Sequence, residues 1–154
     1  MTEPTSYTQI PRATMWLLQE DDFVMGGESP DTNPSFPTYV ESFYISKAPI
    51  TNVQFEAFQP EYIRVEGSSD DSPAVGVTLF EAAGYCEWYA RISKKKFRLP
   101  TEIEWEFACR GGTTGPHFVD IQTAGNFIWS AENSGSQAQL AESLKANPAG
   151  LHNM

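Results

Sequence analysis

The sequence predicts an α+β fold, irregular and rich in loops, and three observations lead to that class. Three threonines, Thr51, Thr78 and Thr101, are each followed three residues later by Gln or Glu, the spacing of a capping box at the start of a helix. Two short segments are rich in the aromatic and β-branched residues that are typical of strands. The chain also holds eleven glycines and eleven prolines in 154 residues, which suits long loops better than a helical bundle.

The order of the predicted elements also argues for a single irregular domain. Residues 1–14 are polar and form an N-terminal extension, and residues 15–154 form the domain. A strand is expected at 23–27, a polar loop at 28–37 and a second strand at 39–45. Strands and helices do not alternate regularly, and no glycine-rich phosphate loop follows a strand, which disfavours a doubly wound parallel sheet.

Two of the predicted helices are placed by their apolar spacing. The first covers about 51–58, and the second runs from 78 to about 93. Four residues of the second helix share one face that we expect in the core: Leu79, Ala83, Cys86 and Ala90. Brief strand-like segments are expected at 75–77 and 127–129.

The third helix has a signal at each end. Pro100 holds Leu99 extended, Thr101 and Glu104 form the capping box, and Gly111 stands where a left-handed C-cap is wanted.

Charged residues around this helix are open to a catalytic reading, but a structural one is favoured. We expect Glu104 to cap, Arg98 and Glu102 to pair, and Arg110 to organise its surroundings as a buried guanidinium.

Composition excludes several classes of partner. The net charge of −10 repels phosphate backbones, so no nucleic-acid partner is expected, and the basic run Lys94–Lys96 is interpreted as complementing a helix dipole. No apolar run approaches the roughly 18–20 residues of a membrane span. The N-terminus lacks the basic and apolar regions of a secretory signal, so we expect a cytoplasmic protein.

The two cysteines, Cys86 and Cys109, both fall in predicted helices. The default is two reduced, buried thiols, although the sequence leaves a bridge between them open. Their spacing relative to His117 and His152 matches no zinc site.

Residues 97–112 read FRLPTEIEWEFACRGG and resemble the signature RLPTEAEWE-(Y/F)-A-x-RGG of the formylglycine-generating-enzyme, or sulfatase-modifying-factor, superfamily. Other segments resemble the same family in the same order: residues 23–26, 40–55, 73–88, 129–135 and 147–154. The resemblance covers residues 15–154 and implies a C-type-lectin-like fold.

The resemblance also implies a chemistry. The family's oxidases use a copper-binding cysteine pair to convert a substrate cysteine to formylglycine with O2. That pair follows an element G-L-Y-D-M, which Gly150–Met154 resembles. We therefore expect 15–154 to be the N-terminal portion of a domain that is incomplete at its C-terminus, non-catalytic by itself, with copper only in a complete catalytic member. Cys86 and Cys109 resemble the family's structural cysteine positions.

Two functions stay open at this point. A C-terminal segment or a protein partner would complete an oxidase-type domain, and exposed apolar surface near Trp129 would favour such association. Alternatively, the fold is a non-catalytic ligand- or protein-binding module, as in the diversity-generating-retroelement variable proteins that share it.

Calcium is the one metal that the resemblance implies within these residues. Asn126, with the carbonyl of Phe127 or Ile128, resembles the family's first calcium site, and Asn153 resembles part of a second. The alternative for Asn126 is a turn asparagine that bonds its own backbone.

Overall fold

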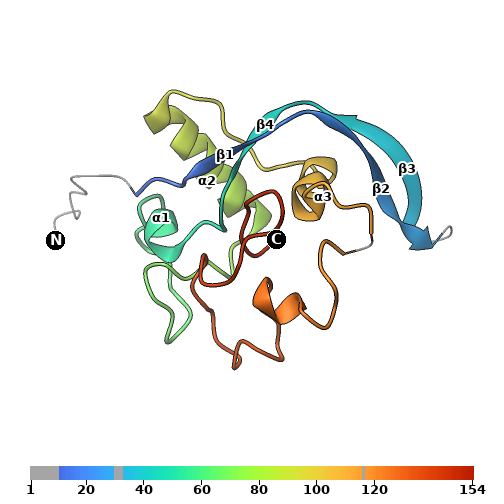
Figure 1. Ribbon diagram of the computed structural model, residues 1–154. Helices are drawn as coiled ribbons and strands as arrows, with labels where there is room; N and C mark the ends of the chain where they lie inside the picture. Colours follow the sequence, from blue (N-terminus) through green and yellow to red (C-terminus); the bar gives the residue numbers. More distant parts are fainter. Residues whose placement is uncertain (1–10, 30–32, 116) are drawn as a thin grey trace, which may run out of the picture.

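A computed structural model describes residues 11–29, 33–115 and 117–154 (Figure 1). Residues 1–10 of the predicted extension and 30–32 of the predicted loop lie outside the described residues. The elements are β1 (Met15–Leu18), β2 (Asp21–Ser29), β3 (Asn33–Val40), β4 (Phe43–Ser46), α1 (Asn52–Glu56), α2 (Leu79–Ser93), α3 (Glu102–Arg110) and the 3-10 helix η1 (Ala124–Asn126). This mixture of elements confirms the α+β class. No helix in these ranges is long and apolar enough to cross a membrane.

The four strands form two antiparallel pairs, β1 with β4 and β2 with β3. Figure 1 shows the pairs following one another as one bent ribbon beside α3. At the bend, the Glu20 amide donates to Ser42 Oγ at 2.9 Å, and Ser42 Oγ donates to Glu20 Oε2 at 3.2 Å. The single strand predicted at 39–45 is therefore wrong, because the ribbon bends at residues 41–42 and divides that segment between β3 and β4.

The loop predicted at 28–37 is also wrong at both ends, because β2 continues through Ser29 and β3 begins at Asn33. Pro34 and Pro37 misled the prediction, since proline lacks the amide that a central strand needs. In a two-stranded pair each strand keeps one open edge, and an edge tolerates proline.

All three capping boxes are confirmed, and α3 shows the arrangement clearly. The Thr101 amide donates to Glu104 Oε2 at 2.7 Å, and the Glu104 amide donates to Thr101 Oγ1 at 3.2 Å. Gly111 ends α3 with φ 57°, the left-handed C-cap that was expected. An added Cβ at Gly111 would stand 2.8 Å from the Ala149 backbone nitrogen, so the close approach of the C-terminal turn also requires glycine.

One hydrophobic cluster surrounds α3 and is built on the buried residues Leu18, Ala108 and Leu151; we call it the Ala108 cluster. Asn147, also buried, joins its parts. Its Nδ2 donates to the carbonyls of Ala108 (2.8 Å) and Cys109 (3.0 Å), and its Oδ1 accepts from the Leu151 amide (3.0 Å). The C-terminal turn is thereby fixed to the end of α3.

A second, aromatic cluster surrounds α2 and is built on Phe55, Tyr85 and Tyr89; we call it the Tyr85 cluster. The predicted core face of α2 is wrong here. Leu79 is 71% exposed, whereas Tyr85 is 6% exposed. The aromatic rings of α2 are buried instead, because they bury more apolar area than Leu79 would. Gly84 leaves room for the ring of Phe58 to pack against the helix.

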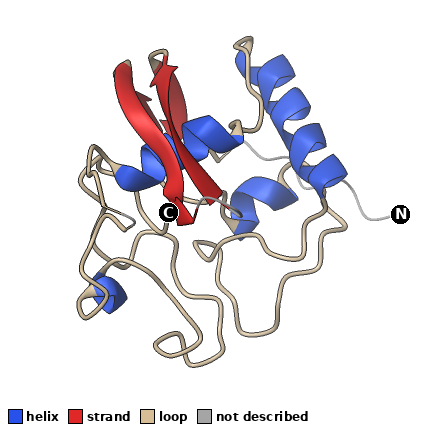
Figure 2. Ribbon diagram, turned by 90° about the vertical axis from the view of Figure 1, so that its right-hand side faces the viewer, coloured by secondary structure: helices blue, strands red, loops and turns tan. Residues whose placement is uncertain are grey.

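The predicted short strands at 75–77 and 127–129 do not form. The Tyr62 hydroxyl forms hydrogen bonds with both backbone groups of Val75. It accepts from the Val75 amide and donates to the Val75 carbonyl, each at 2.9 Å. The amides of Phe127 and Ile128 both donate to the Ala124 carbonyl at 2.9 Å, which keeps that segment in a turn. Figure 2 shows that the part of the molecule away from the strands is mostly loop, with η1 among it.

Candidate functional site

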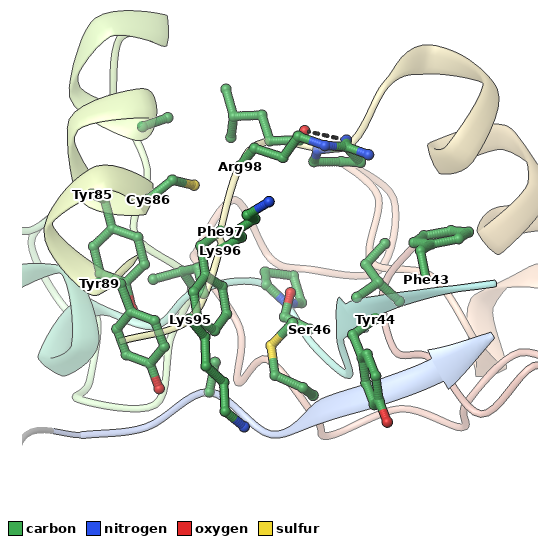
Figure 3. Close-up of a pocket in the computed structure, with 18 of the residues that line it drawn as sticks. Phe43, Tyr44, Ser46, Tyr85, Cys86, Tyr89, Lys95, Lys96, Phe97 and Arg98 are labelled. Carbon is green, nitrogen blue, oxygen red and sulfur yellow. Dashed lines mark hydrogen bonds between the residues drawn. The ribbon is translucent and has the colours of Figure 1, made fainter. Parts of the chain in front are cut away.

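A cavity of about 820 Å³ lies between α2, the segment 95–100 and β4 (Figure 3). Its walls are mainly apolar and aromatic, with few polar groups. The residues that line it include Tyr44, Ser46, Tyr85, Cys86, Tyr89 and Phe97. A cavity of this size and character is the usual setting for a ligand site.

The α2 wall consists of packed rings and one polar group without a partner. Tyr89 stacks on Tyr85 with ring centroids 5.9 Å apart and meets Phe97 edge-to-face at 4.7 Å. The Tyr85 hydroxyl is buried and has no hydrogen-bond partner among the described residues. Burial is the main cause that raises the pKa of Tyr85, so the hydroxyl keeps its proton and remains a donor. Because solvent does not reach this oxygen, it is an unsatisfied donor inside the wall rather than a group presented to the cavity.

The two cysteines occupy different places. Cys86 is half-buried and lines the cavity, whereas Cys109 lies on α3 and does not line it. Neither cysteine forms a disulfide, so the bridge that the sequence left open is absent. Burial raises the pKa of each, and the nearby Glu106 carboxylate adds to the rise at Cys109. Both are therefore protonated and weakly nucleophilic near neutral pH.

The mouth of the cavity is charged. Arg98 Nη1 and Nη2 each lie 2.6 Å from an oxygen of Glu104, so the predicted pairing of Arg98 with Glu102 is wrong. Arg98 pairs with Glu104 rather than Glu102 because the capping box already holds the Glu104 carboxylate at the start of α3. The Arg98 hydrogen bonds are the first cause that lowers the pKa of Glu104 to about 2. Lys95 and Lys96 also line the mouth and are exposed.

The floor of the cavity is the edge of β4. The Lys47 amide donates to the Thr14 carbonyl at 2.8 Å, and Ile45 stands opposite Trp16 in β1. Hydrogen-bonded and non-bonded pairs alternate along an antiparallel ladder. The backbone groups of Tyr44 and Ser46 therefore face away from β1. No backbone partner for them occurs within the described ranges.

Arg110 organises the other side of α3, as predicted. Its Nε donates to Glu106 Oε1 at 2.9 Å, its Nη1 donates to the Gly115 carbonyl at 3.2 Å, and its Nη2 bonds the Gly26 carbonyl. Glu106 Oε1 also accepts from the Gly26 amide at 2.8 Å. This network fixes β2 to α3 and contributes no wall to the cavity.

The predicted calcium residues lie away from the cavity. Asn126 is exposed at the end of η1, and its carbonyl accepts from the Lys145 amide at 2.9 Å. Lys145 Nζ lies 5.9 Å from the centroid of the Phe127 ring. The carbonyl of Ile128 accepts from Asn133 Nδ2 at 3.0 Å. These surroundings supply an ammonium and an amide rather than the carboxylates that calcium prefers.

Asn153 differs from Asn126. Its Nδ2 donates to the Ala141 carbonyl at 2.7 Å, and its backbone is left-handed with φ 53°. Its Oδ1 is buried and lacks a partner among the described residues. In the same ranges, no cluster of three or more His, Cys, Asp or Glu could hold a metal ion.

The sequence did not indicate the cavity. A signal was present in Tyr85 and Tyr89, two aromatic residues four apart on one helix face. Spacing shows that such rings share a face, but it does not show that β4 lies opposite them.

Comparison with known proteins identifies the fold and the family. The chain matches the FGE-sulfatase family, described as a sulfatase-modifying factor enzyme 1-like domain, over residues 2–154. It is 28% identical to the serine/threonine-protein kinase pkn1 of Chlamydia caviae, over 90% of this chain and 26% of that protein. It is also 51% identical to the inactive C-alpha-formylglycine-generating enzyme 2 of Mus musculus over 43 residues. That match covers 28% of this chain and 12% of the mouse protein.

Solved structures of low sequence identity share the fold. PvdO of Pseudomonas aeruginosa has a TM-score of 0.76 at 19% identity, covering 90% of this chain and 66% of that one. Treponema denticola variable protein 1 has a TM-score of 0.79 at 18% identity, covering 91% and 68%. The chain thus spans about a quarter of the length of its kinase relative and about two thirds of these structures. With its signature at residues 97–112 and a family match over nearly every residue, the chain belongs to the sulfatase-modifying factor enzyme 1-like family.

Proposed function

We propose that this chain is a non-catalytic binding module of its family, and that the cavity beside β4 accepts a segment of polypeptide. The observation that carries the proposal is the cavity itself, about 820 Å³ with aromatic walls and an open strand edge along its floor. Extended peptides bind such edges through their backbone, and neighbouring pockets take their side chains.

The thiol chemistry supports binding over oxidation. A copper site of the oxidase type needs soft thiolate ligands close together. Cys86 stands in the cavity without Cys109, and burial keeps both protonated by raising the pKa of each thiol. The residues present therefore suit a packed wall rather than a redox pair.

The relatives are compatible with this proposal. One is named an inactive formylglycine-generating enzyme, and another is a kinase of which this chain matches about a quarter. The competing proposal is that a longer form of the protein is a formylglycine-generating oxidase, as other relatives are named.

The chain offers an internal control for testing the binding proposal. We would alkylate both cysteines with iodoacetamide, with and without a ten-residue peptide that alternates valine and threonine and ends in two glutamates. An occupied cavity should slow the labelling of Cys86 at least threefold and leave Cys109 unchanged, as mass spectrometry of the two tryptic peptides would show. In the variant Ala82→Phe, whose ring narrows the cavity beside Cys86, the peptide should slow the labelling of Cys86 less than in the unaltered chain. Equal labelling of Cys86 with and without peptide in the unaltered chain contradicts the proposal.

The oxidase alternative has its own test. The chain would be supplied with copper(I), oxygen and a cysteine-containing substrate peptide. Formation of an aldehyde that reacts with hydrazide would favour the oxidase and count against the non-catalytic proposal.

Calcium remains a structural proposal, and Asn153 fits it better than Asn126 or Phe127. The unpartnered Oδ1 of Asn153 is an oxygen that a cation would satisfy. Millimolar calcium should then raise the melting temperature of the chain and leave that of Asn153→Ala unchanged. No shift in the unaltered chain returns all three residues to structural roles.

A further inference from the structure

We infer that the polypeptide accepted by the cavity is an acidic segment of a separate protein, and that Lys95 and Lys96 recognise its carboxylates. The inference rests on the proposed function and names the chemistry of the partner. Three features of the chain lead to it: the uneven distribution of its charge, the fixed backbone that carries the two lysines, and the apolar cavity beside them.

Positive charge is concentrated in one short segment, residues 91–98, which we call the basic segment. None of the twenty Asp and Glu residues falls in it, whereas five of the ten Lys and Arg residues do. These five are Arg91, Lys94, Lys95, Lys96 and Arg98. The other five cations share the rest of the chain with all twenty acidic residues. A basic patch on an otherwise acidic protein steers acidic partners to that one place.

The dipole of α2 accounts for only part of this charge. Arg91 lies in the last turn of α2, and Lys94 is its C-cap, so both stand where a cation complements the negative end of a helix. This effect falls off within the last turn. Lys95 and Lys96 lie beyond the cap, are exposed and line the cavity. Neither takes part in an ion pair in the part of the chain that the structure describes.

The backbone that carries the two lysines is held next to them. Phe97 packs its ring edge-to-face against Tyr89, with centroids 4.7 Å apart. Arg98 is bound by both carboxylate oxygens of Glu104, so its charge is already paired. The lysines thus supply the positive charge that is available to a partner at the mouth. Because the segment is ordered before a partner arrives, binding costs little further ordering of its backbone.

The cavity and the lysines together define the sequence of the partner. The aromatic wall, which includes Tyr89 and Phe97, suits apolar side chains, whereas the lysines remain at the surface. Figure 3 shows Lys95 and Lys96 directed to opposite sides of the segment that carries them. One carboxylate would not meet both ammonium groups. The partner is therefore a short apolar stretch next to at least two Asp or Glu residues.

A nucleic acid is the other polyanion that a basic segment can bind. It is disfavoured because a phosphate backbone is charged along its whole length, and would run from the basic segment onto the acidic remainder of the chain. An acidic peptide confines its charge to the residues that meet the lysines. Its uncharged residues are then free to enter the apolar cavity.

The test compares three end-capped peptides that share one alternating Val/Thr core and end in Glu-Glu, Gln-Gln or Lys-Lys. Fluorescence anisotropy gives the Kd of each. At low salt the Glu-Glu peptide should bind at least about tenfold more tightly than the Gln-Gln peptide, and the Lys-Lys peptide should bind most weakly. In about 0.5 M salt the preference should fall below about threefold, because exposed charges are screened. Equal Kd values for the Glu-Glu and Gln-Gln peptides at low salt would overturn the inference.

Charge reversal locates the recognition. Lys95→Glu and Lys96→Glu should each weaken binding of the Glu-Glu peptide about tenfold and leave the Gln-Gln peptide unaffected. The matched control is Lys145→Glu, which makes the same change in net charge at an exposed lysine that does not line the cavity. It should change the Kd less than about twofold. Equal losses in all three variants would mean that net charge governs binding, which contradicts recognition by the basic segment.

Alkylation of Cys86 with the same peptides separates this inference from the proposed function. If the Gln-Gln peptide slows alkylation as strongly as the Glu-Glu peptide, a polypeptide fills the cavity without acidic recognition, which overturns the inference alone. If no peptide slows alkylation at either salt concentration, both proposals are overturned. Tighter binding of an oligothymidylate than of the Glu-Glu peptide, lost in Lys96→Glu, would assign the basic segment to nucleic acid and overturn the inference.

Discussion

The two hydrophobic clusters of this molecule differ in how fully their buried polar groups are hydrogen-bonded. In the Ala108 cluster, Asn147 is 5% exposed and all its side-chain groups are hydrogen-bonded. In the Tyr85 cluster, Tyr85 is buried to a similar extent, but its hydroxyl has no partner in the described residues. The first cluster is closed by chain from both ends of the sequence, whereas the second opens onto the cavity.

The two clusters should therefore respond differently to substitution. A closed, fully bonded region loses stability with almost any change, because each removed group leaves a buried partner unsatisfied. A region with an unpaired buried donor tolerates loss of that donor, because no partner is left unsatisfied. The following predictions test the comparison.

The largest effect is expected at Asn147. Asn147→Ala leaves the carbonyls of Ala108 and Cys109 and the amide of Leu151 without their partner, which should cost about 3 kcal/mol of unfolding free energy. Asn133 also uses both ends of its side chain, but it is exposed. Asn133→Ala should therefore cost less than about 1 kcal/mol in the same urea denaturation experiment. Similar costs would show that the Ala108 cluster is not closed as described.

A smaller effect is expected at the junction between α3 and the C-terminal turn. Gly111→Ala adds a methyl group near the Ala149 backbone nitrogen and strains a positive φ, which should cost about 2 kcal/mol. Gly112 also has a positive φ, but an added Cβ there meets nothing within 4 Å. Gly112→Ala should cost about 1 kcal/mol, so thermal melts of the pair isolate the steric contact.

Tyr62 and Tyr85 allow a direct comparison of a hydrogen-bonded hydroxyl with an unbonded one. Tyr62→Phe removes the hydroxyl that bonds both backbone groups of Val75, and should cost about 1.5 kcal/mol. Tyr85→Phe removes a hydroxyl that has no partner among the described residues, and the chain should keep or slightly gain stability. A loss of stability in Tyr85→Phe comparable to that in Tyr62→Phe would mean that the hydroxyl is bonded in solution.

The smallest effect concerns pH at the mouth of the cavity. The pKa of Glu104 is lowered to about 2 in the folded chain, so its contribution is complete above about pH 4.5 and is lost as pH falls toward 2. Because Arg98 is largely exposed, solvent screening limits the contribution to about 1 kcal/mol. Denaturation between pH 2 and 6 should show a shallower loss in Glu104→Gln. An identical pH profile would contradict the ion pair.

Local signals predicted the local structure well. The capping boxes and the C-cap at Gly111 were correct because each depends on residues within one turn of helix. Predictions failed where distant chain decides the outcome. Pro34 and Pro37 are tolerated because β3 keeps an open edge. The pairing of Arg98 was wrong for a local reason, because the capping box holds the Glu104 carboxylate beside it.

The candidate site was less predictable than the fold. The metal candidates Asn126, Phe127 and Asn153 came from resemblance, and the structure places them outside the cavity. The spacing of Tyr85 and Tyr89 showed a shared helix face, but their relation to β4 depends on residues about 40 positions earlier in the chain.

The sequence by itself determined the family, the α+β class and the starts of the three helices. Short-range hydrogen bonds and steric limits are sufficient for these features. Tertiary structure alone decided which face of α2 is buried and where the edge of β4 remains open. These outcomes depend on competition among distant surfaces for burial, and the larger aromatic area prevails.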